Sequence, residues 1–125
     1  MILGIGTDIV QVSRMKRWIE NPDMLTRFFN EAEQMEKGTE SARCQHFAVR
    51  FAAKEAFSKA LGTGISGFSL QDVYITNDKS GKPFLNVKDS AADVLKEHCG
   101  SGELKLHVSL SHEKEYATAF VIIEG

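Results

Sequence analysis

The stretch that most constrains the fold is a long helical pattern that ends with the segment Arg50–Gly64. Ala, Leu, Lys and Glu dominate it and favour a helix, which Ser41 can begin and either Gly62 or Gly64 can end. At about 100° per residue, apolar side chains cover both sides of this helix. The narrow polar strip that remains comprises Arg43, Arg50, Lys54 and Ser58. Such a helix is expected at the centre of a domain or of a subunit interface.

One acidic residue interrupts the apolar pattern of this helix. Glu55 lies in the middle of an apolar face, and Lys59 follows one turn later. The structural interpretation is an ion pair between the two, worth roughly 0.3–0.5 kcal/mol on a surface. The functional interpretation is that Glu55 binds a metal ion and Lys59 binds the anion that the metal also touches. A second carboxylate elsewhere in the chain would favour the functional interpretation.

Length and composition indicate one soluble domain. The 125 residues suit a single domain, 1–125, with one core, and 42% hydrophobic with 26% charged residues is typical of globular proteins. A net charge of −2 argues against a nucleic-acid partner, and no apolar run is long enough to span a membrane. Without a secretory signal or a C-x-x-C motif, Cys44 and Cys99 are expected to be reduced, buried thiols in a cytoplasmic protein.

The N-terminal residues 1–12 are rich in β-branched and apolar residues and predict a strand. Apolar residues occur on both of its faces, so we expect it to be central in its sheet. With a period of two, Gly4, Gly6 and Asp8 share one face, and the glycines are expected to clear space beside Asp8. The structural alternative is that the glycines form a bulge and Asp8 ends the strand.

The remaining residues predict short helices and two pairs of antiparallel strands. The fold class is therefore α+β, with a small antiparallel sheet packed by helices on one side. Expected helices are 14–20 with Ser13 as N-cap, 23–30, 30–37 opened by an Asn30–Glu33 capping box, and 90–99. Expected strands are 73–76 and 84–87, which form a hairpin, and 104–111 and 116–123.

Two acids now stand out, Asp8 beside glycines on a strand and Glu55 on the central helix. One or two carboxylates, completed by water and phosphate, are a usual way to hold Mg²⁺. Cationic and hydroxyl side chains that could bind phosphate oxygens are Lys59, Lys54, Arg50, Ser109, Ser111 and His112. No zinc-type His/Cys spacing, Walker A motif or G-x-S-x-G elbow is present. The residues alone therefore indicate a Mg²⁺-dependent site for a phosphate or diphosphate ligand.

Three motifs carry a more specific resemblance. They are G-I-G-T-D-I-V at 4–10, F-A-A-K-E-A-F-S-K-A-L-G at 51–62 and S-L-S-H-E-K-E-Y-A at 109–117. In order, spacing and total chain length, the sequence resembles the holo-[acyl-carrier-protein] synthases, the short, trimeric type of 4′-phosphopantetheinyl transferase.

This resemblance implies a fold, a reaction and a set of site residues. The fold would be the 4′-phosphopantetheinyl transferase fold. The reaction would move 4′-phosphopantetheine from coenzyme A to a serine of apo-acyl carrier protein, as in fatty acid biosynthesis, and would leave adenosine 3′,5′-bisphosphate. The family's metal ligands match Asp8 and Glu55, which would hold Mg²⁺, with Lys59 as a third catalytic residue. Residues expected to contact coenzyme A are Arg50, Lys59, Gly62, Ser111 and His112.

The resemblance also implies two kinds of protein contact. A homotrimer with active sites at the subunit boundaries would explain a central helix that is apolar on nearly every side. The basic segment that contains Arg14 and Arg17 would dock the acidic carrier protein, since Arg14 matches an arginine that the family uses in this way. Without that resemblance, the segment could be an ordinary solvated amphipathic helix. Two further alternatives are a Mg²⁺-dependent enzyme for another nucleotide diphosphate and a non-catalytic trimer that binds coenzyme A or is purely structural.

Overall fold

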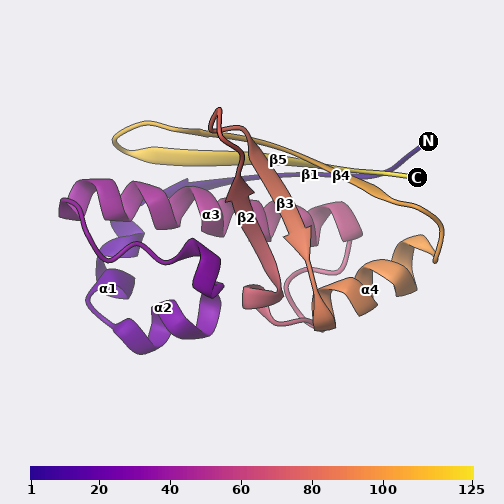
Figure 1. The fold of residues 1–125 in the computed structure, drawn as a ribbon, viewed down its shortest axis with the longest axis horizontal. Coiled ribbons are helices and arrows are strands. Elements are labelled where there is room, and N and C mark those ends of the chain that lie inside the picture. The colour runs from indigo at the N-terminus through magenta and orange to yellow at the C-terminus, as the bar shows by residue number, and fades with distance from the viewer.

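The long central helix predicted from the sequence organises the whole molecule. In the computed structural model, which describes residues 1–125, α3 (Glu40–Leu61) runs along a three-stranded antiparallel sheet (Figure 1). The sheet has the order β1-β5-β4, with β1 at Ile2–Gln11, β5 at Tyr116–Glu124 and β4 at Lys105–His112. A separate hairpin pairs β2 (Val73–Asn77) with β3 (Pro83–Val87). The α+β fold class is confirmed, although the strands form two sheets rather than one.

The first strand lies at the edge of its sheet, so the expectation of a central strand was wrong. β1 pairs only with β5. It is apolar on both faces because its outer face carries exposed side chains, including Ile5 and Ile9, each 62% exposed. Its inner face carries Gly6 and Val10, which are buried against the rest of the chain.

The N-cap of the central helix lies two residues earlier than predicted, and the helix ends where expected. Thr39 is the N-cap, because its hydroxyl accepts a hydrogen bond from the Ala42 amide at 3.0 Å. Ser41 lies inside the first turn instead. Thr39 and Ser41 are both suitable caps, and the sequence pattern does not separate them. Gly62 follows the helix with a φ of 81°, a left-handed conformation that favours glycine.

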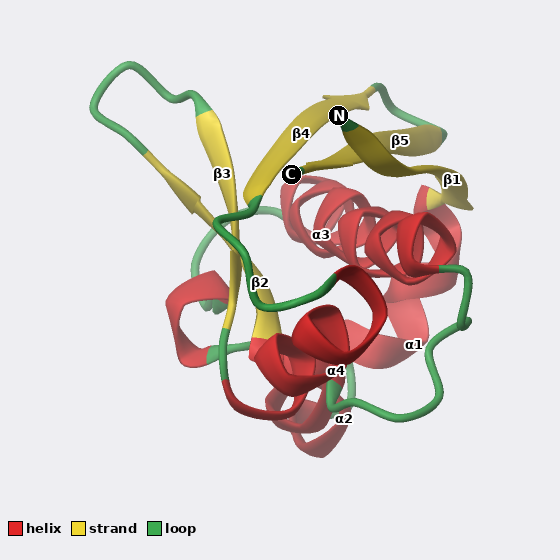
Figure 2. Cartoon of the chain, turned by 90° about the vertical axis from the view of Figure 1, so that its right-hand side faces the viewer, coloured by secondary structure: helices red, strands yellow, loops and turns green.

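The helices predicted at 14–20, 23–30 and 30–37 are shorter than the sequence indicated, whereas the one predicted at 90–99 is present over its full length. Residues 12–20 form a 3₁₀ turn, Val12–Met15, and a single-turn helix α1, Lys16–Ile19, so Ser13 is not an N-cap. The Asn30–Glu33 capping box is present, but it opens only a 3₁₀ turn, since Gln34 is already extended. The remaining elements are α2 (Pro22–Phe28), an unanticipated 3₁₀ turn (Leu70–Asp72) and α4 (Asp89–Cys99). Figure 2 shows α1, α2 and α4 on the side of α3 away from the three-stranded sheet.

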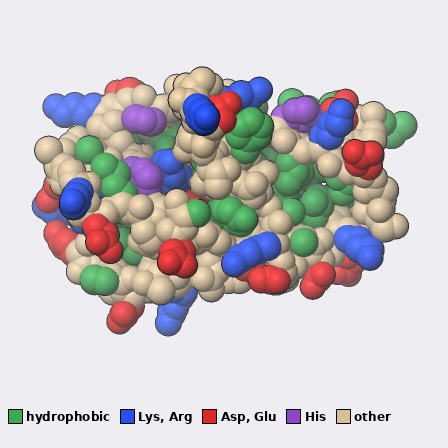
Figure 3. All heavy atoms as spheres, viewed as in Figure 1, with side chains coloured by type: hydrophobic (Ala, Val, Ile, Leu, Met, Phe, Trp, Pro, Cys, Tyr) green, Lys and Arg blue, Asp and Glu red, His purple; other side chains and the backbone are tan.

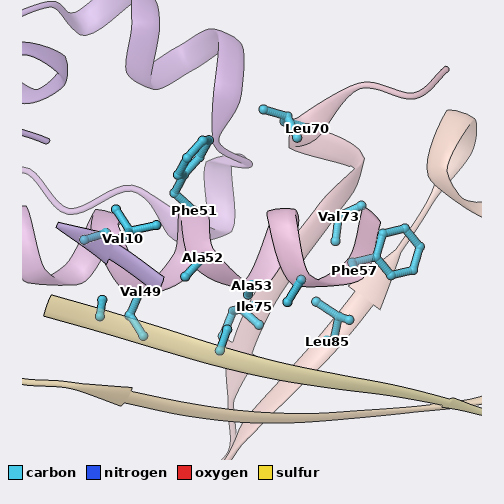
Figure 4. Packing of buried hydrophobic residues seen from close by; sticks show 14 of the residues in the cluster. Val10, Val49, Phe51, Ala52, Ala53, Phe57, Leu70, Val73, Ile75 and Leu85 are labelled. Atoms are coloured by element: carbon cyan, nitrogen blue, oxygen red, sulfur yellow. The ribbon is translucent and has the colours of Figure 1, made fainter. Parts of the chain in front are cut away.

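Both apolar sides of α3 are covered by this chain itself. The sheet packs on one side, and the hairpin and short helices pack on the other. Figure 4 shows Ala52, Ala53 and Phe57 of α3 close to buried residues of the strands, such as Val73 and Ile75. None of the helices combines the length and apolar character needed to cross a bilayer.

Two residues assigned to the polar strip of α3 are fully buried, and that assignment was wrong. Lys54 and Ser58 are both 0% exposed, because the hairpin and the 3₁₀ turn at 70–72 cover this side of the helix. Lys54 Nζ donates to Glu33 Oε1 at 2.6 Å and to the carbonyl oxygens of Leu70 and Val73. Lys54 is therefore unavailable to a phosphate ligand.

The two cysteines are both free thiols but differ in exposure. Cys44 is buried, as expected, whereas Cys99 is only partly buried at the end of α4. Burial raises the pKa of both thiols. Neither cysteine therefore has the lowered pKa of a reactive thiolate.

Candidate active site

The glycines of β1 bring this strand directly onto the backbone of α3. A Cβ atom on Gly6 would lie 1.8 Å from the Ala56 carbonyl oxygen, and one on Gly4 would lie 2.1 Å from that of Ala60. The glycines thus make room for the helix backbone rather than for a ligand. The strand also continues past Asp8 to Gln11, against the alternative in which Asp8 ends it. The side chain of Asp8, on the same face as Gly6, contacts α3 through Lys59.

Asp8 forms an ion pair with Lys59. The distance from Lys59 Nζ to Asp8 Oδ1 is 2.9 Å, and the side chains are 54% and 15% exposed, respectively. The pair anticipated between Glu55 and Lys59 is therefore replaced by one between the strand and the helix. A strand partner cannot be inferred from spacing along the helix alone.

Glu55 lies beside this pair and completes a cluster of two acids and two basic groups. Its pKa is raised, first by desolvation and then by the negative charge of Asp8, while Lys59 and Arg14 oppose the shift. The structure thus brings together Asp8, Glu55 and Lys59, as predicted. No third acidic residue, histidine or cysteine joins them in a complete metal-binding group. A metal ion held here would take its other ligands from water or from phosphate oxygens, which suits Mg²⁺.

Arg14 lies at the edge of this cluster, in the 3₁₀ turn between β1 and α1. Its guanidinium carbon is 5.8 Å from the centre of the Phe51 ring, within range of a cation–π contact. Both Arg14 and Arg17 are exposed, Arg17 on the short helix α1. The two arginines are therefore available to a partner protein. Arg14 is also close enough to Glu55 to lower the pKa of that carboxyl group.

A second cluster surrounds Arg50, on an earlier turn of α3. Arg50 donates to the His46 carbonyl oxygen at 3.1 Å and to Asn77 Oδ1 of the hairpin at 3.3 Å. Its Nε atom is buried and has no hydrogen-bond partner, and burial lowers the pKa of Arg50. His112, at the end of β4, makes a hydrogen bond to Gln45 Oε1 at 2.9 Å. Arg50 and His112 both lower the pKa of His46, so the two lie near one residue, and we call them, with the exposed Ser111 that precedes His112, the basic cluster.

His46 lies next to the basic cluster, because Arg50 and His112 both act on its pKa. Its Nε2 lies 2.6 Å from the Glu33 carbonyl oxygen. Burial, with a further contribution from Arg50, lowers the pKa of His46 to about 4. The spacing of four residues between His46 and Arg50 places them on one helix face and could have revealed this neighbour. Figure 3 shows histidine and Lys or Arg side chains gathered over the N-terminal half of α3.

The two clusters face different sides of α3. Arg50 and Lys59 are nine positions apart, which at 3.6 residues per turn corresponds to about 180° around the axis. Gly62 is exposed one turn beyond Lys59, on the far side of that residue from Arg50. Within one chain, the residues predicted to contact coenzyme A therefore do not form a single pocket.

Comparison with known proteins decides the family. The sequence profile of the 4′-phosphopantetheinyl transferase superfamily matches residues 4–121. The chain belongs to this superfamily. It is thus an enzyme of the transferase class, and the resemblance carried by the three motifs is confirmed. The match includes every residue of both clusters.

Individual relatives agree over the full length. The chain is 49% identical over 126 residues to a holo-[acyl-carrier-protein] synthase of Treponema denticola, with 100% of both chains covered. It is 42% identical over 126 residues to the Clostridium tetani protein of the same name, with 100% of this chain and 98% of the relative covered.

Solved structures show the same fold. A holo-[acyl-carrier-protein] synthase of Neisseria meningitidis superposes with a TM-score of 0.82 at 34% identity and 100% coverage of both chains. A Bacillus anthracis synthase, solved in complex with CoA (3′,5′-ADP), superposes with a TM-score of 0.78 at 37% identity, covering 100% of this chain and 98% of the other. The 4′-phosphopantetheinyl transferase fold predicted from the resemblance is therefore confirmed.

Proposed function

We propose that this protein is a Mg²⁺-dependent holo-[acyl-carrier-protein] synthase that moves 4′-phosphopantetheine from coenzyme A to a serine of apo-acyl carrier protein. The observation that carries the proposal is the meeting of Asp8, Glu55 and Lys59 where β1 packs on α3. Full-length relatives named holo-[acyl-carrier-protein] synthase supply the substrate class. The other product is adenosine 3′,5′-bisphosphate, and the proposed setting is fatty acid biosynthesis in the cytoplasm.

The two carboxylates fit a Mg²⁺ site on chemical grounds. Glu55 is partly desolvated and faces a second negative charge, and both effects raise its pKa. A cation between Asp8 and Glu55 would offset both effects. Mg²⁺ bound there would neutralise charge on the diphosphate of coenzyme A during the transfer.

The chain's own residues supply positioning and further neutralisation. Transfer forms a bond from the serine oxygen to the phosphorus that carries pantetheine and breaks the bridging P–O bond to the bisphosphate. Lys59, with a half-exposed ammonium group, is placed to bind the phosphate oxygens that gain charge. The serine proton leaves as the new P–O bond forms, and Glu55, beside Asp8 and Lys59, is the carboxylate placed to accept it.

The basic cluster is proposed to bind a phosphate of coenzyme A. The buried Nε of Arg50 lacks a partner that an anion would provide. His112, which already reaches α3 through Gln45, and the neighbouring Ser111 lie at the exposed end of β4. Gly62, which has no side chain, leaves open space beyond the last turn of α3 for the ligand to pass Lys59.

A homotrimer is proposed on grounds that differ from those suggested by the sequence. Because α3 is covered within the chain, the surface left for an interface is the outer face of the three-stranded sheet. This face exposes Ile5, Ile9 and Phe120, at 62%, 62% and 53%. An apolar sheet face of this kind is typical of a subunit contact. Since Arg50 and Lys59 face opposite sides of α3, neighbouring subunits would together complete each active site.

The carrier protein is proposed to dock on the exposed Arg14 and Arg17. Carrier proteins are acidic, so opposite charge would steer them toward these residues. Arg14 also influences the pKa of Glu55, so this surface lies next to the proposed catalytic centre. No nucleic acid and no membrane enters the proposal.

Mass spectrometry tests the function directly. Apo-acyl carrier protein incubated with this protein, coenzyme A and Mg²⁺ should gain the mass of phosphopantetheine. The gain should vanish when EDTA is added and should return with excess Mg²⁺. Absence of the added mass in every condition would refute the activity, and a gain that EDTA leaves unchanged would refute the role of the metal.

A further inference from the structure

Asp8 meets a cation of the chain at the place proposed for the metal. Lys59 Nζ lies 2.9 Å from Asp8 Oδ1, and this is the one hydrogen bond that the Asp8 side chain makes. Glu55, the other carboxylate, has no ion-pair partner, although Lys59 and Arg14 both lower its pKa somewhat. The Lys59 ammonium therefore neutralises the carboxylate that the metal would share.

The geometry also shows that the Lys59 side chain can leave Asp8 for another partner. Its side chain is 54% exposed and lies near the C-terminal end of α3, with Asp8 as its partner. Exposed ion pairs of this kind are weak and are screened by salt. By contrast, Lys54 on the same helix is 0% exposed and donates to three oxygens. Of the two lysines, only Lys59 can change its partner without disturbing the core.

We propose that Lys59 and the divalent cation compete for Asp8, and that Lys59 moves to the phosphate oxygens of coenzyme A when the cation binds. An ammonium and a divalent ion on one carboxylate repel each other, so binding of the cation favours release of Lys59. The released lysine then reaches the diphosphate with its charge unpaired. This inference rests on the proposed metal site and adds an exchange of partners within it.

The test is a titration of Mn²⁺ in the absence of coenzyme A, followed by electron paramagnetic resonance at low ionic strength. Lys59→Gln should bind Mn²⁺ about two- to fivefold more tightly than the parent, the range expected for loss of one exposed ion pair. Lys59→Arg, which keeps the charge beside Asp8, should bind no more tightly than the parent. The difference between the parent and Lys59→Gln should shrink as salt is added.

A matched control separates the ion pair from general electrostatics. Arg14→Gln also removes a positive charge near Glu55 but breaks no bond to Asp8, so it should tighten Mn²⁺ binding less than Lys59→Gln. Equal effects of the two variants, or no tightening by Lys59→Gln, would refute the competition.

The failure of the metal site itself has a different signature. If Asp8→Asn and Glu55→Gln both leave Mn²⁺ binding at the parent's level, the ion binds elsewhere and the proposed site is wrong. If Asp8→Asn abolishes binding and Lys59→Gln does not tighten it, the site stands and only the competition is wrong. Absence of Mn²⁺ binding in the parent and in all variants would count against both.

Discussion

Two lysines on α3 form ion pairs in opposite environments. Lys54 pairs with Glu33, and the two side chains are 1% and 0% exposed. Lys59, five positions later, pairs with Asp8 on the surface at 54% and 15% exposure. The same residue type on one helix therefore serves the fold at one position and the proposed chemistry at the other. What separates them is the number of fixed partners each has.

The buried pair has every donor and acceptor satisfied. The three protons of Lys54 meet Glu33 and two backbone carbonyl oxygens, and Glu33 in turn accepts hydrogen bonds from the Asn30 and Ile75 amides. Burial lowers the pKa of Lys54, and the Glu33 carboxylate opposes this shift. The pair thus joins α3, β2 and the 3₁₀ turn at 31–33. The exposed pair has a single hydrogen bond and can exchange it.

The largest expected effect comes from breaking the buried pair. Lys54→Met should lower the free energy of unfolding by about 3–5 kcal/mol, because it leaves the Glu33 carboxylate buried without a counter-ion. Urea denaturation at one fixed protein concentration measures the change. The matched control, Lys59→Met on the same helix, should lose less than about 1 kcal/mol.

If Lys54→Met and Lys59→Met lost similar stability, the buried pair would matter no more to the fold than the exposed one. Glu33→Leu combined with Lys54→Met should recover part of the loss, since no charge is then left unpaired. The recovery should be incomplete, because the carbonyl oxygens of Leu70 and Val73 and the Ile75 amide would still lack their partners.

The next effect concerns activity without loss of stability. Glu55→Gln should lower turnover about a hundredfold or more, the scale of losing one group that stabilises developing charge. Thermal stability should stay the same or rise, because the variant removes one of two facing negative charges. Glu97→Gln, at an exposed position of α4, is the control and should leave both quantities unchanged. Near-normal turnover of Glu55→Gln would show that Glu55 is not a metal ligand.

The sequence predicted the residues around the exposed Lys59–Asp8 pair better than it predicted the buried Lys54–Glu33 pair. Asp8 and Glu55 could be assigned together because each lies in a motif and shares a face with residues that fix its direction. The predicted ion-pair partner of Lys59 was wrong, because spacing along the helix favours Glu55 and carries no information about a neighbouring strand. Tertiary contacts with Asp8 decide the outcome.

The burial of Lys54 could not be predicted from helical periodicity. A helical projection shows which residues share a face, but not which later segment covers that face. Here residues 70–75 and Glu33 supply the cover and the hydrogen bonds. The position of β1 at the sheet edge was missed for a related reason. Exposed Ile5 and Ile9 resemble core residues in sequence, whereas they lie on the face proposed to meet another subunit.

A third group, His46, should make the stability of the protein depend on pH. Its pKa in the folded protein is about 4, against 6.5 as its ordinary value, because of burial and then Arg50. Arg43 and His112 lower it further, and the hydrogen bond to the Glu33 carbonyl opposes them. As the pH falls, His46 is protonated in the unfolded chain before it is protonated in the folded one. Its contribution to the free energy of unfolding should therefore be fully present above pH 6.5 and be lost as the pH drops toward 4.

The size of this pH effect is moderate because part of the His46 ring reaches solvent. Allowing for screening, we expect a loss of about 1 kcal/mol between pH 6.5 and about pH 5 from this group. His46→Gln should remove that part of the slope in urea denaturation curves recorded across this range. An unchanged slope in the variant would mean that His46 titrates normally.

The smallest expected effect tests the surface next to the exposed pair. Arg14→Glu should raise the KM for carrier protein a few-fold, because charge attraction to an acidic partner is lost and its rim contacts are weak. The KM for coenzyme A should hardly change, and added salt should weaken carrier-protein binding in the parent more than in the variant. Stability should change little, since Arg14 is exposed and contacts the Phe51 ring at the surface. A rise in the KM for coenzyme A alone would instead make Arg14 a phosphate ligand. The docking surface would then have to lie elsewhere, and the exposed charges around Asp8 would all serve the nucleotide.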